Sequence, residues 1–151
     1  MSEQTTRRCV LFLCTGNSCR SQMAEAFLRE IAGDGFEVAS AGTNPVRVNP
    51  LAVRVMAEAA IDISDQYAKS VDEMAGRHFD YVITVCDRAR EVCPVFPGDA
   101  KKLHWSFDDP AEATGTEEQQ VSVFRRVRDE IAKRVRDFVS QSERSGQSAG
   151  S

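Results

Sequence analysis

The sequence predicts an α/β fold: a single domain in three layers, with a four-stranded parallel sheet and helices on both faces. Three observations support this prediction. Short apolar runs, typical of buried strands, alternate along the chain with segments of helical periodicity. The 151 residues are enough for one domain with a substantial core. Hydrophobic residues make up 42% of the chain and charged residues 28%, as in an ordinary globular protein.

The predicted domain spans residues 8–139. Residues 1–7 and 140–151 are polar, and the second segment is rich in Ser and Gly, so we expect both to be disordered. No run reaches the roughly 18 apolar residues of a membrane span, and the N-terminus has no apolar signal core. The formal net charge is −4 and the pI about 5.2. We therefore expect a cytoplasmic monomer with neither a membrane nor a nucleic-acid partner.

The first half of the chain predicts strand, helix and strand. Residues 9–14 form a continuous apolar run, typical of a strand buried on both faces. A helix follows, with Met23, Phe27 and Ile31 on one face and Gly33 as its stop. Residues 36–42 read as the second strand.

The second half repeats the alternation. A helix begins with Asn49 as cap and Pro50 in its first turn, and a short helix is expected at 70–74. Strands are expected at 80–86 and 101–105, with a short helix or loop at 87–93. A long helix follows a polar loop, and its apolar residues keep to one stripe: Val121, Phe124, Val127, Ile131, Val135 and Phe138.

The segment from Cys14 to Arg20, of the form C-x5-R, joins the first strand to the first helix. A loop at this place can turn its backbone N–H groups toward one point, and the helix N-terminus adds further donors. Gly16 permits the conformations that this needs, and the Arg20 guanidinium can hold two oxyanion oxygens. We expect a cradle for a tetrahedral oxyanion, formed by Thr15, Gly16, Asn17, Ser18, Cys19, Arg20 and Ser21.

Cys14 lies at the base of this cradle. The positive field there favours the thiolate form, which is the reactive one. Ser21 and Asn17 can donate or relay further hydrogen bonds to it. The sequence therefore predicts that Cys14 is a nucleophile aimed at the centre of a bound oxyanion.

Four motifs together resemble the thioredoxin-coupled arsenate reductases, which share the fold of the low-molecular-weight protein tyrosine phosphatases. They are "CTGNSCRSQMAE", "SAGT…VNP", "VITVCDRAREVCP" and "HWSFDDPA". The resemblance covers about residues 8–138. It implies that Cys14 attacks arsenate, that Arg20 binds it, and that Asp109 is the general acid that protonates the departing oxygen. Asp108 has no assigned role.

The resemblance also implies how the electrons move. Cys86 would attack Cys14, releasing arsenite and leaving a Cys14–Cys86 disulfide. Cys93 would then attack Cys86, and thioredoxin would reduce the resulting Cys86–Cys93 disulfide. Cys19 is not a required redox thiol in this family, and Cys9 matches no motif.

The spacing of Cys86 and Cys93 adds a hypothesis. In a helix these residues would lie about 10 Å apart along the axis, whereas a disulfide needs Cα atoms within roughly 7 Å. We therefore expect that oxidation unwinds residues 86–93 and moves the disulfide outward.

We expect no bound cofactor and no metal. Some members of the family hold a potassium ion with Asn, Glu, Ser and Asp. Asn17, Glu25 and Ser40 match three of these positions, but the fourth is Lys69. A lysine ammonium can replace the ion and pair with Glu25, so we expect no potassium dependence.

Two other functions are compatible with parts of the sequence. A low-molecular-weight tyrosine phosphatase hydrolysing phosphomonoesters would share the loop, the arginine and the aspartate, and phosphate is a competing oxyanion. Such enzymes usually carry aromatic residues after the Asp-Pro, where this chain has Ala111, Glu112 and Ala113. A non-enzymatic thiol sensor of metal or arsenite is the second alternative, although zinc sites favour close pairs such as C-x2-C.

Overall fold

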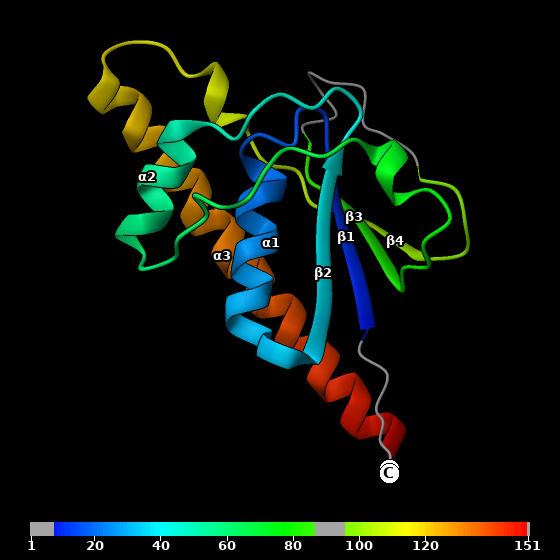
Figure 1. Ribbon diagram of the computed structural model, residues 1–151. Coiled ribbons are helices and arrows are strands. Elements are labelled where there is room, and N and C mark those ends of the chain that lie inside the picture. Colours follow the sequence, from blue (N-terminus) through cyan, green and yellow to red (C-terminus); the bar gives the residue numbers. More distant parts are fainter. Residues whose placement is uncertain (1–7, 87–95, 151) are drawn as a thin grey trace.

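The sheet is the centre of the structure, a computed structural model that describes residues 8–86 and 96–150, with side chains as far as Ser142. Its strand order is β2-β1-β3-β4, and every neighbouring pair is parallel. The strands are β1 (Arg8–Cys14), β2 (Phe36–Gly42), β3 (Tyr81–Thr84) and β4 (Lys101–His104). The predicted four-stranded parallel sheet is thus confirmed (Figure 1).

β1 is the strand around which both cores form. Val10 and Phe12 belong to one hydrophobic core and Leu11 and Leu13 to the other, because successive side chains of a strand point to opposite faces. All four are fully buried. The continuous apolar run in the sequence therefore marks the strand that both layers cover.

The three α-helices share the core that contains Val10 and Phe12. They are α1 (Arg20–Ala32), α2 (Pro50–Glu58) and α3 (Glu117–Gly150), and Figure 1 shows them as one layer on the same side of the sheet. The other face is covered, within the described residues, by the short 3-10 helix η2 (Val71–Met74) and by Phe79 and Phe96. Two further 3-10 turns are η1 (Gly33–Gly35) and η3 (Pro110–Glu112).

The predicted helical faces agree with the structure in most places. The whole apolar stripe of α3 is buried, and so are Met23 and Phe27 of α1. Ile31 is 37% exposed, so its assignment to the buried face was wrong: it lies in the last turn of α1, beyond the edge of the core. α3 reaches Gly150, past the expected domain end at 139, and Ser142 is still buried. Residues 1–7 lie outside the described residues.

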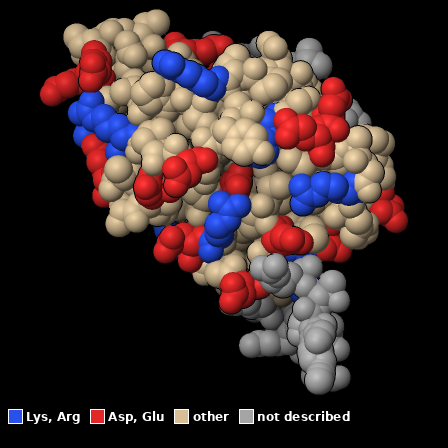
Figure 2. Space-filling model, in the orientation of Figure 1, with Lys and Arg blue, Asp and Glu red and all other residues tan. Residues whose placement is uncertain are grey.

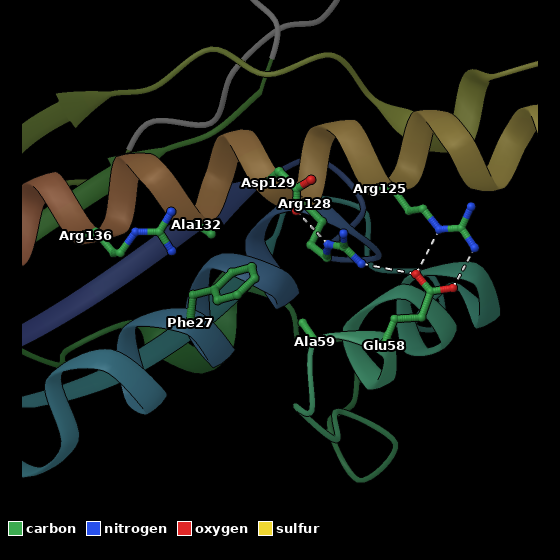
Figure 3. Close-up of a pocket in the computed structure, with 8 residues that line it drawn as sticks. All are labelled: Phe27, Glu58, Ala59, Arg125, Arg128, Asp129, Ala132 and Arg136. Carbon is green, nitrogen blue, oxygen red and sulfur yellow. Dashed lines mark hydrogen bonds and ion pairs between the residues drawn. The ribbon is translucent and has the colours of Figure 1, made fainter.

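α2 is held to α3 by arginines of the longer helix. Arg125 donates two hydrogen bonds to Glu58, of 2.9 and 2.7 Å (Figure 3). Arg128 donates to the carbonyl oxygen of Val55 at 2.9 Å. These arginines therefore bind the C-terminal end of α2, where helix carbonyls lack internal partners. The N-terminal end has the predicted cap, because the Asn49 side chain accepts a hydrogen bond from Leu51 N at 2.8 Å.

Charges of both signs are interspersed on the surface. Figure 2 shows acidic and basic side chains alternating over the face that α1 and α2 occupy. The Arg-rich sequence of α3 also forms pairs of opposite charge, such as the i, i+4 pair Arg126–Glu130. None of the helices in the described part of the chain is long and apolar enough to cross a membrane.

Candidate active site

The loop between β1 and α1 wraps round the sulfur of Cys14. Cys14 is the last residue of β1 and Arg20 the first of α1, so residues 15–19 make the whole turn. Cys14 is 2% exposed and carries a free thiol. The backbone N–H of Asn17 points at Cys14 Sγ, with an N–S distance of 3.2 Å. This N–H is one of the loop donors that were expected to point toward the site.

Three loop carbonyls face away from this centre, toward residues 43–49. Asn44 N donates to Thr15 O at 2.9 Å, Val46 N to Gly16 O at 3.0 Å, and Asn49 N to Ser18 O at 3.1 Å. A peptide unit directs its N–H opposite to its C=O. The segment therefore keeps the N–H groups of Gly16, Asn17 and Cys19 turned the other way, and that of Asn17 points at Cys14 Sγ. Loop N–H groups held in this way can bind a tetrahedral anion.

Asn17, rather than Gly16, has the unusual backbone conformation of the loop. Its φ is +48°, in the left-handed region that Asn tolerates better than most residues. Our expectation that Gly16 supplies this freedom was wrong. The Cβ position of Gly16 has its nearest neighbour at 3.5 Å, an ordinary contact.

The Asn17 side chain is fully buried and uses both ends of its amide. Its Oδ1 accepts hydrogen bonds from Lys69 N at 2.7 Å and Gln22 Nε2 at 2.9 Å. Its Nδ2 donates to Ser21 Oγ at 2.8 Å and to Ser40 Oγ at 3.0 Å. With every position of the amide occupied, the strained residue is held in one orientation.

The direction of these bonds determines what Ser21 can do. Ser21 Oγ already accepts a hydrogen from the Asn17 amide, and it lies 2.8 Å from Cys14 Sγ. Its own hydrogen is then available to the sulfur. Ser40 also accepts a hydrogen bond from the Asn17 side chain and passes its own hydrogen on, donating to Glu25 Oε1 at 2.5 Å. The network therefore brings two donors to the Cys14 sulfur: the N–H of Asn17 and, when the sulfur is ionised, the hydroxyl of Ser21.

Gln22 is a supporting residue that the sequence did not reveal. Its side chain is fully buried, and its Nε2 also lies within hydrogen-bond distance of Asn17 O and Tyr67 O, at 3.0 and 2.9 Å. Its Oε1 accepts from Gln66 Nε2 at 2.6 Å. A glutamine in the first turn of a helix is unremarkable in sequence, so no local signal pointed to this role.

Gly42, at the end of β2, is a second residue whose role the sequence did not reveal. A Cβ atom built on it would lie 2.4 Å from Thr15 O and 2.9 Å from Asn17 N, distances that side-chain carbons do not adopt. Only glycine allows the strand end to approach the loop this closely. The available signal was a glycine ending a strand, which is also the mark of many ordinary turns.

Arg20, at the end of the loop, lies beside Asp109. Arg20 is 3% exposed; its Nη1 donates to Phe107 O at 3.3 Å, and its Nη2 lies 3.5 Å from Asp109 Oδ2. Asp109 also caps η3 by accepting from Ala111 N at 3.0 Å. Asp108 instead pairs with Arg126 of α3 at 3.0 Å. Of the two aspartates, the structure therefore brings Asp109 to the loop.

Cys86 lies close to Cys14 through the sheet. Leu13 is the register partner of Thr84, and Val85 N donates to Leu13 O at 2.9 Å. Cys14 thus ends one strand, and Cys86 lies two residues beyond the end of the adjacent one. Cys86 is fully buried and disulfide-bonded, whereas Cys9, Cys14 and Cys19 carry free thiols. Cys93, and with it the hypothesis of unwinding over residues 86–93, lies outside the described residues.

The protein family to which the chain belongs is shown by a match to a family model, and the arrangement of the loop agrees with it. The model of the family described as "Low molecular weight phosphotyrosine protein phosphatase" matches residues 9–148. The chain belongs to the low molecular weight phosphotyrosine protein phosphatase family. This match confirms the predicted fold, because the resemblance was to proteins that share the fold of this family.

Within the phosphatase family, the chain is similar to proteins named arsenate reductase. One from Halalkalibacterium halodurans is 49% identical over 132 residues, covering 87% of this chain and 95% of the relative. A solved structure of an arsenate reductase in the phosphate binding state has a TM-score of 0.74 and 32% identity, with 89% of this chain and 98% of that one covered. The thioredoxin-dependent arsenate reductase of Corynebacterium glutamicum has a TM-score of 0.72 and 31% identity, covering 95% of this chain and 65% of that one.

Lys69 lies beside Glu25, at the position where the sequence suggested a lysine in place of a potassium ion. Its Nζ lies 3.9 Å from Glu25 Oε1 and 2.9 Å from Tyr67 O. Burial lowers the pKa of Lys69, and the Glu25 carboxylate acts in the opposite direction. The predicted pairing of Lys69 with Glu25 is present. Among the residues that the structure describes, no cluster of three or more His, Cys, Asp or Glu side chains forms a metal site.

Cys19 is a weaker candidate than Cys14 for the role of nucleophile. Burial raises the pKa of the Cys19 thiol to about 12, and its Sγ lies 3.6 Å from Ser18 Oγ. A thiol with such a pKa is protonated at neutral pH and is a weak nucleophile. Of the two free cysteines at the loop, only Cys14 has both the Ser21 hydroxyl and the backbone N–H of Asn17 within hydrogen-bond distance of its sulfur.

Proposed function

We propose that this chain is an arsenate reductase in which Cys14 is the nucleophile and Cys86 and Cys93 carry the oxidation away. One observation carries the proposal: a buried free thiol faces an N–H and a hydroxyl donor, while a disulfide-bonded cysteine follows the neighbouring strand end. A hydrolase of this family needs the first feature and not the second. The similarity to proteins named arsenate reductase supports the same choice.

The first step is attack on arsenic. The loop N–H groups and the Arg20 guanidinium bind the arsenate oxygens, and the Cys14 thiolate displaces one of them to form an As–S bond. Asp109, 3.5 Å from Arg20 Nη2, donates the proton that lets this oxygen leave as water. Inorganic phosphate, with the same shape and charge, competes for the cradle.

The second step transfers two electrons. The Cys86 thiolate attacks Cys14 Sγ and forms the Cys14–Cys86 disulfide. The electron pair of the As–S bond stays on arsenic, which leaves as arsenite. Arsenic is reduced from As(V) to As(III), and the two cysteines together are oxidised by two electrons.

The third step regenerates Cys14. The Cys93 thiolate attacks Cys86 Sγ, Cys14 leaves as a thiolate, and a Cys86–Cys93 disulfide remains for thioredoxin to reduce. A disulfide at Cys86 beside a free Cys14 thiol is the combination that this step produces, which supports the proposal. We further propose that the protein is a monomer. We also propose that it lies in the cytoplasm, because a thiol relay of this kind needs a reducing compartment.

The test is arsenate-dependent consumption of NADPH in the presence of thioredoxin and thioredoxin reductase. Wild type should turn over, whereas Cys14→Ser, Cys86→Ser and Cys93→Ser should each lose at least about a thousandfold, because each breaks the relay. Cys9→Ser is the matched control and should keep its activity, since Cys9 lies on β1 beside Glu37, with its Sγ 3.4 Å from that carboxylate. Turnover in Cys86→Ser or Cys93→Ser would contradict the relay, and hydrolysis of phosphomonoesters without arsenate reduction would favour the phosphatase.

A further inference from the structure

A groove lies on the face of the sheet opposite the three α-helices, which we call the η2 groove. Val71, Ala75, Phe96 and Pro97 form its apolar walls, and the exposed Asp72 and Arg77 belong to its lining as a charged rim. Its volume is about 510 Å³. Ala75 and Pro97 are exposed, so the apolar walls are open to solvent. None of the residues used in the proposed reaction lines this groove.

The walls of the groove are fixed from beneath. Phe96 is buried, and its ring lies 5.6 Å from that of Phe79 in an edge-to-face arrangement. The Arg77 guanidinium lies over the same Phe79 ring, 5.0 Å from its centre, and donates to Met74 Sδ at 3.3 Å. The groove is therefore preformed on the core that contains Leu11 and Leu13. Binding of a partner there costs little conformational entropy, because the groove residues are already ordered.

Covalent geometry places the groove close to the disulfide that must be reduced. Cys93 precedes Phe96 by three residues, so their Cα atoms lie within about 11 Å of each other in any chain conformation. A transient redox interface buries roughly 600 Å² on each partner, a patch of about 14 Å radius. A protein that attacks Cys93 can therefore reach the groove beside Phe96 and the exposed Pro97.

We propose that the η2 groove is part of the docking surface for thioredoxin, and that it receives an apolar side chain next to the attacking cysteine of thioredoxin. The proposal rests on the function proposed above, which requires a protein thiol at Cys93. The walls suit an aliphatic or aromatic side chain, and the Asp72 and Arg77 rim can pair with polar groups around it. The groove then contributes affinity while the cysteines supply the chemistry.

The experiment compares two reductants acting on the same oxidised protein. Ala75→Glu and Pro97→Glu place a carboxylate in the groove, and Ala57→Glu, at an exposed position of α2, is the matched control. For each protein we would measure the rate constants of disulfide reduction by thioredoxin and by dithiothreitol. The thioredoxin-to-dithiothreitol ratio should fall at least tenfold in both groove variants, because docking would bury an unpaired charge, and stay within twofold in Ala57→Glu.

A second measurement needs no groove variant. The Cys86→Ser protein can be trapped through Cys93 on a thioredoxin whose resolving cysteine is replaced by serine. Hydrogen exchange over residues 71–78 should be at least tenfold slower in this adduct than in the unlinked Cys86→Ser protein. Unchanged exchange over these residues would overturn the proposal.

The outcomes separate this proposal from the function on which it rests. If pre-reduced wild type releases arsenite in a single turnover, the proposed function stands, and an unchanged ratio in both groove variants overturns only the docking surface. If Ala75→Glu changes the oligomeric state of the free protein and leaves the ratio unchanged, a second copy of the chain occupies the groove and the proposal is also overturned. If no arsenite is released, the proposed function itself fails.

Discussion

The Oγ of Ser21 lies 2.8 Å from the Sγ of Cys14, and the same oxygen accepts a hydrogen bond from the Asn17 amide. The orientation of this hydroxyl is thus set by a residue that is itself held by Gln22 and by Lys69 N. Cys14 receives its hydrogen bonds from groups that cannot easily turn away. The reactivity of the sulfur therefore depends on a network that extends from α1 to β2 and to the segment before η2.

Ser21→Ala should slow the attack on arsenate. A hydrogen bond to a charged group contributes about 1.5–3 kcal/mol, so the step should be about 10- to 160-fold slower. The measurement is single-turnover arsenite release from pre-reduced protein. Ser122→Ala, at an exposed position of α3, is the matched control, and equal rates for the two variants would contradict a donor role for Ser21.

Asp109→Asn should lower kcat for arsenate by roughly 10²- to 10⁴-fold, the usual contribution of a general acid. Asp108→Asn should change it less than about threefold, because Asp108 faces Arg126 rather than the loop. The coupled thioredoxin assay measures both, provided that reduction of the disulfide is not limiting. Equal losses in the two variants would assign a shared structural role to the pair.

Gly42→Ala should distort the catalytic loop. The new Cβ atom would meet Thr15 O at 2.4 Å, so the strand end and the loop must separate. We expect a loss of about 1–3 kcal/mol in the free energy of unfolding and weaker phosphate binding. Gly35→Ala, where no atom lies within 4 Å of the Cβ position, is the control. Chemical denaturation and phosphate titration of both variants would show whether the close approach matters.

Turnover should be the same in potassium and in sodium salts at equal ionic strength. The ammonium of Lys69 lies 3.9 Å from Glu25, where it supplies a positive charge beside that carboxylate. Lys69→Asp should gain a dependence on potassium, because two carboxylates would then face each other and attract a cation. A strong rise of wild-type activity with potassium, but not sodium, would show that the lysine does not take the place of an ion.

Stability should fall at acidic pH partly through Glu58. Hydrogen bonds from Arg125 lower the pKa of this carboxyl from 4.5 to about 2. A carboxyl with a lowered pKa in the folded state stabilises the fold above pH 4.5, and this contribution disappears as the pH falls toward 2. Glu58→Gln should therefore show a shallower decrease of the unfolding free energy over this range, as measured by denaturant titration. A parallel pH dependence in both proteins would mean that the pair in Figure 3 makes no contribution.

The sheet and the central site could be predicted because their signals are local. A buried strand shows as an apolar run, a helix face as a stripe such as Val121 to Phe138, and the loop as a cysteine and an arginine at fixed spacing. Asp109, the N-cap of η3, was identified through the resemblance of "HWSFDDPA" to the family motif. In each case one short segment contains the whole pattern.

The supporting residues could not be predicted, because their roles arise between segments that are distant in sequence. Gln22 acts through Asn17 and Gln66, which lies 44 positions away. Gly42 matters only because β2 ends against Thr15, and Asn17, rather than Gly16, has the positive φ because four partners hold its amide. Ile31 has the right period for the buried face, but the core ends before its turn of α1.

The hydrogen bonds from residues 44, 46 and 49 to the loop carbonyls have a consequence for protein engineering. The seven residues Cys14 to Arg20 cannot be expected to keep their conformation when they are moved to another protein. A designer who transplants them onto another scaffold must carry residues 42–49 and the backbone of Lys69 as well, since a graft without these neighbours would be free to present carbonyl oxygens, instead of N–H groups, to the anion.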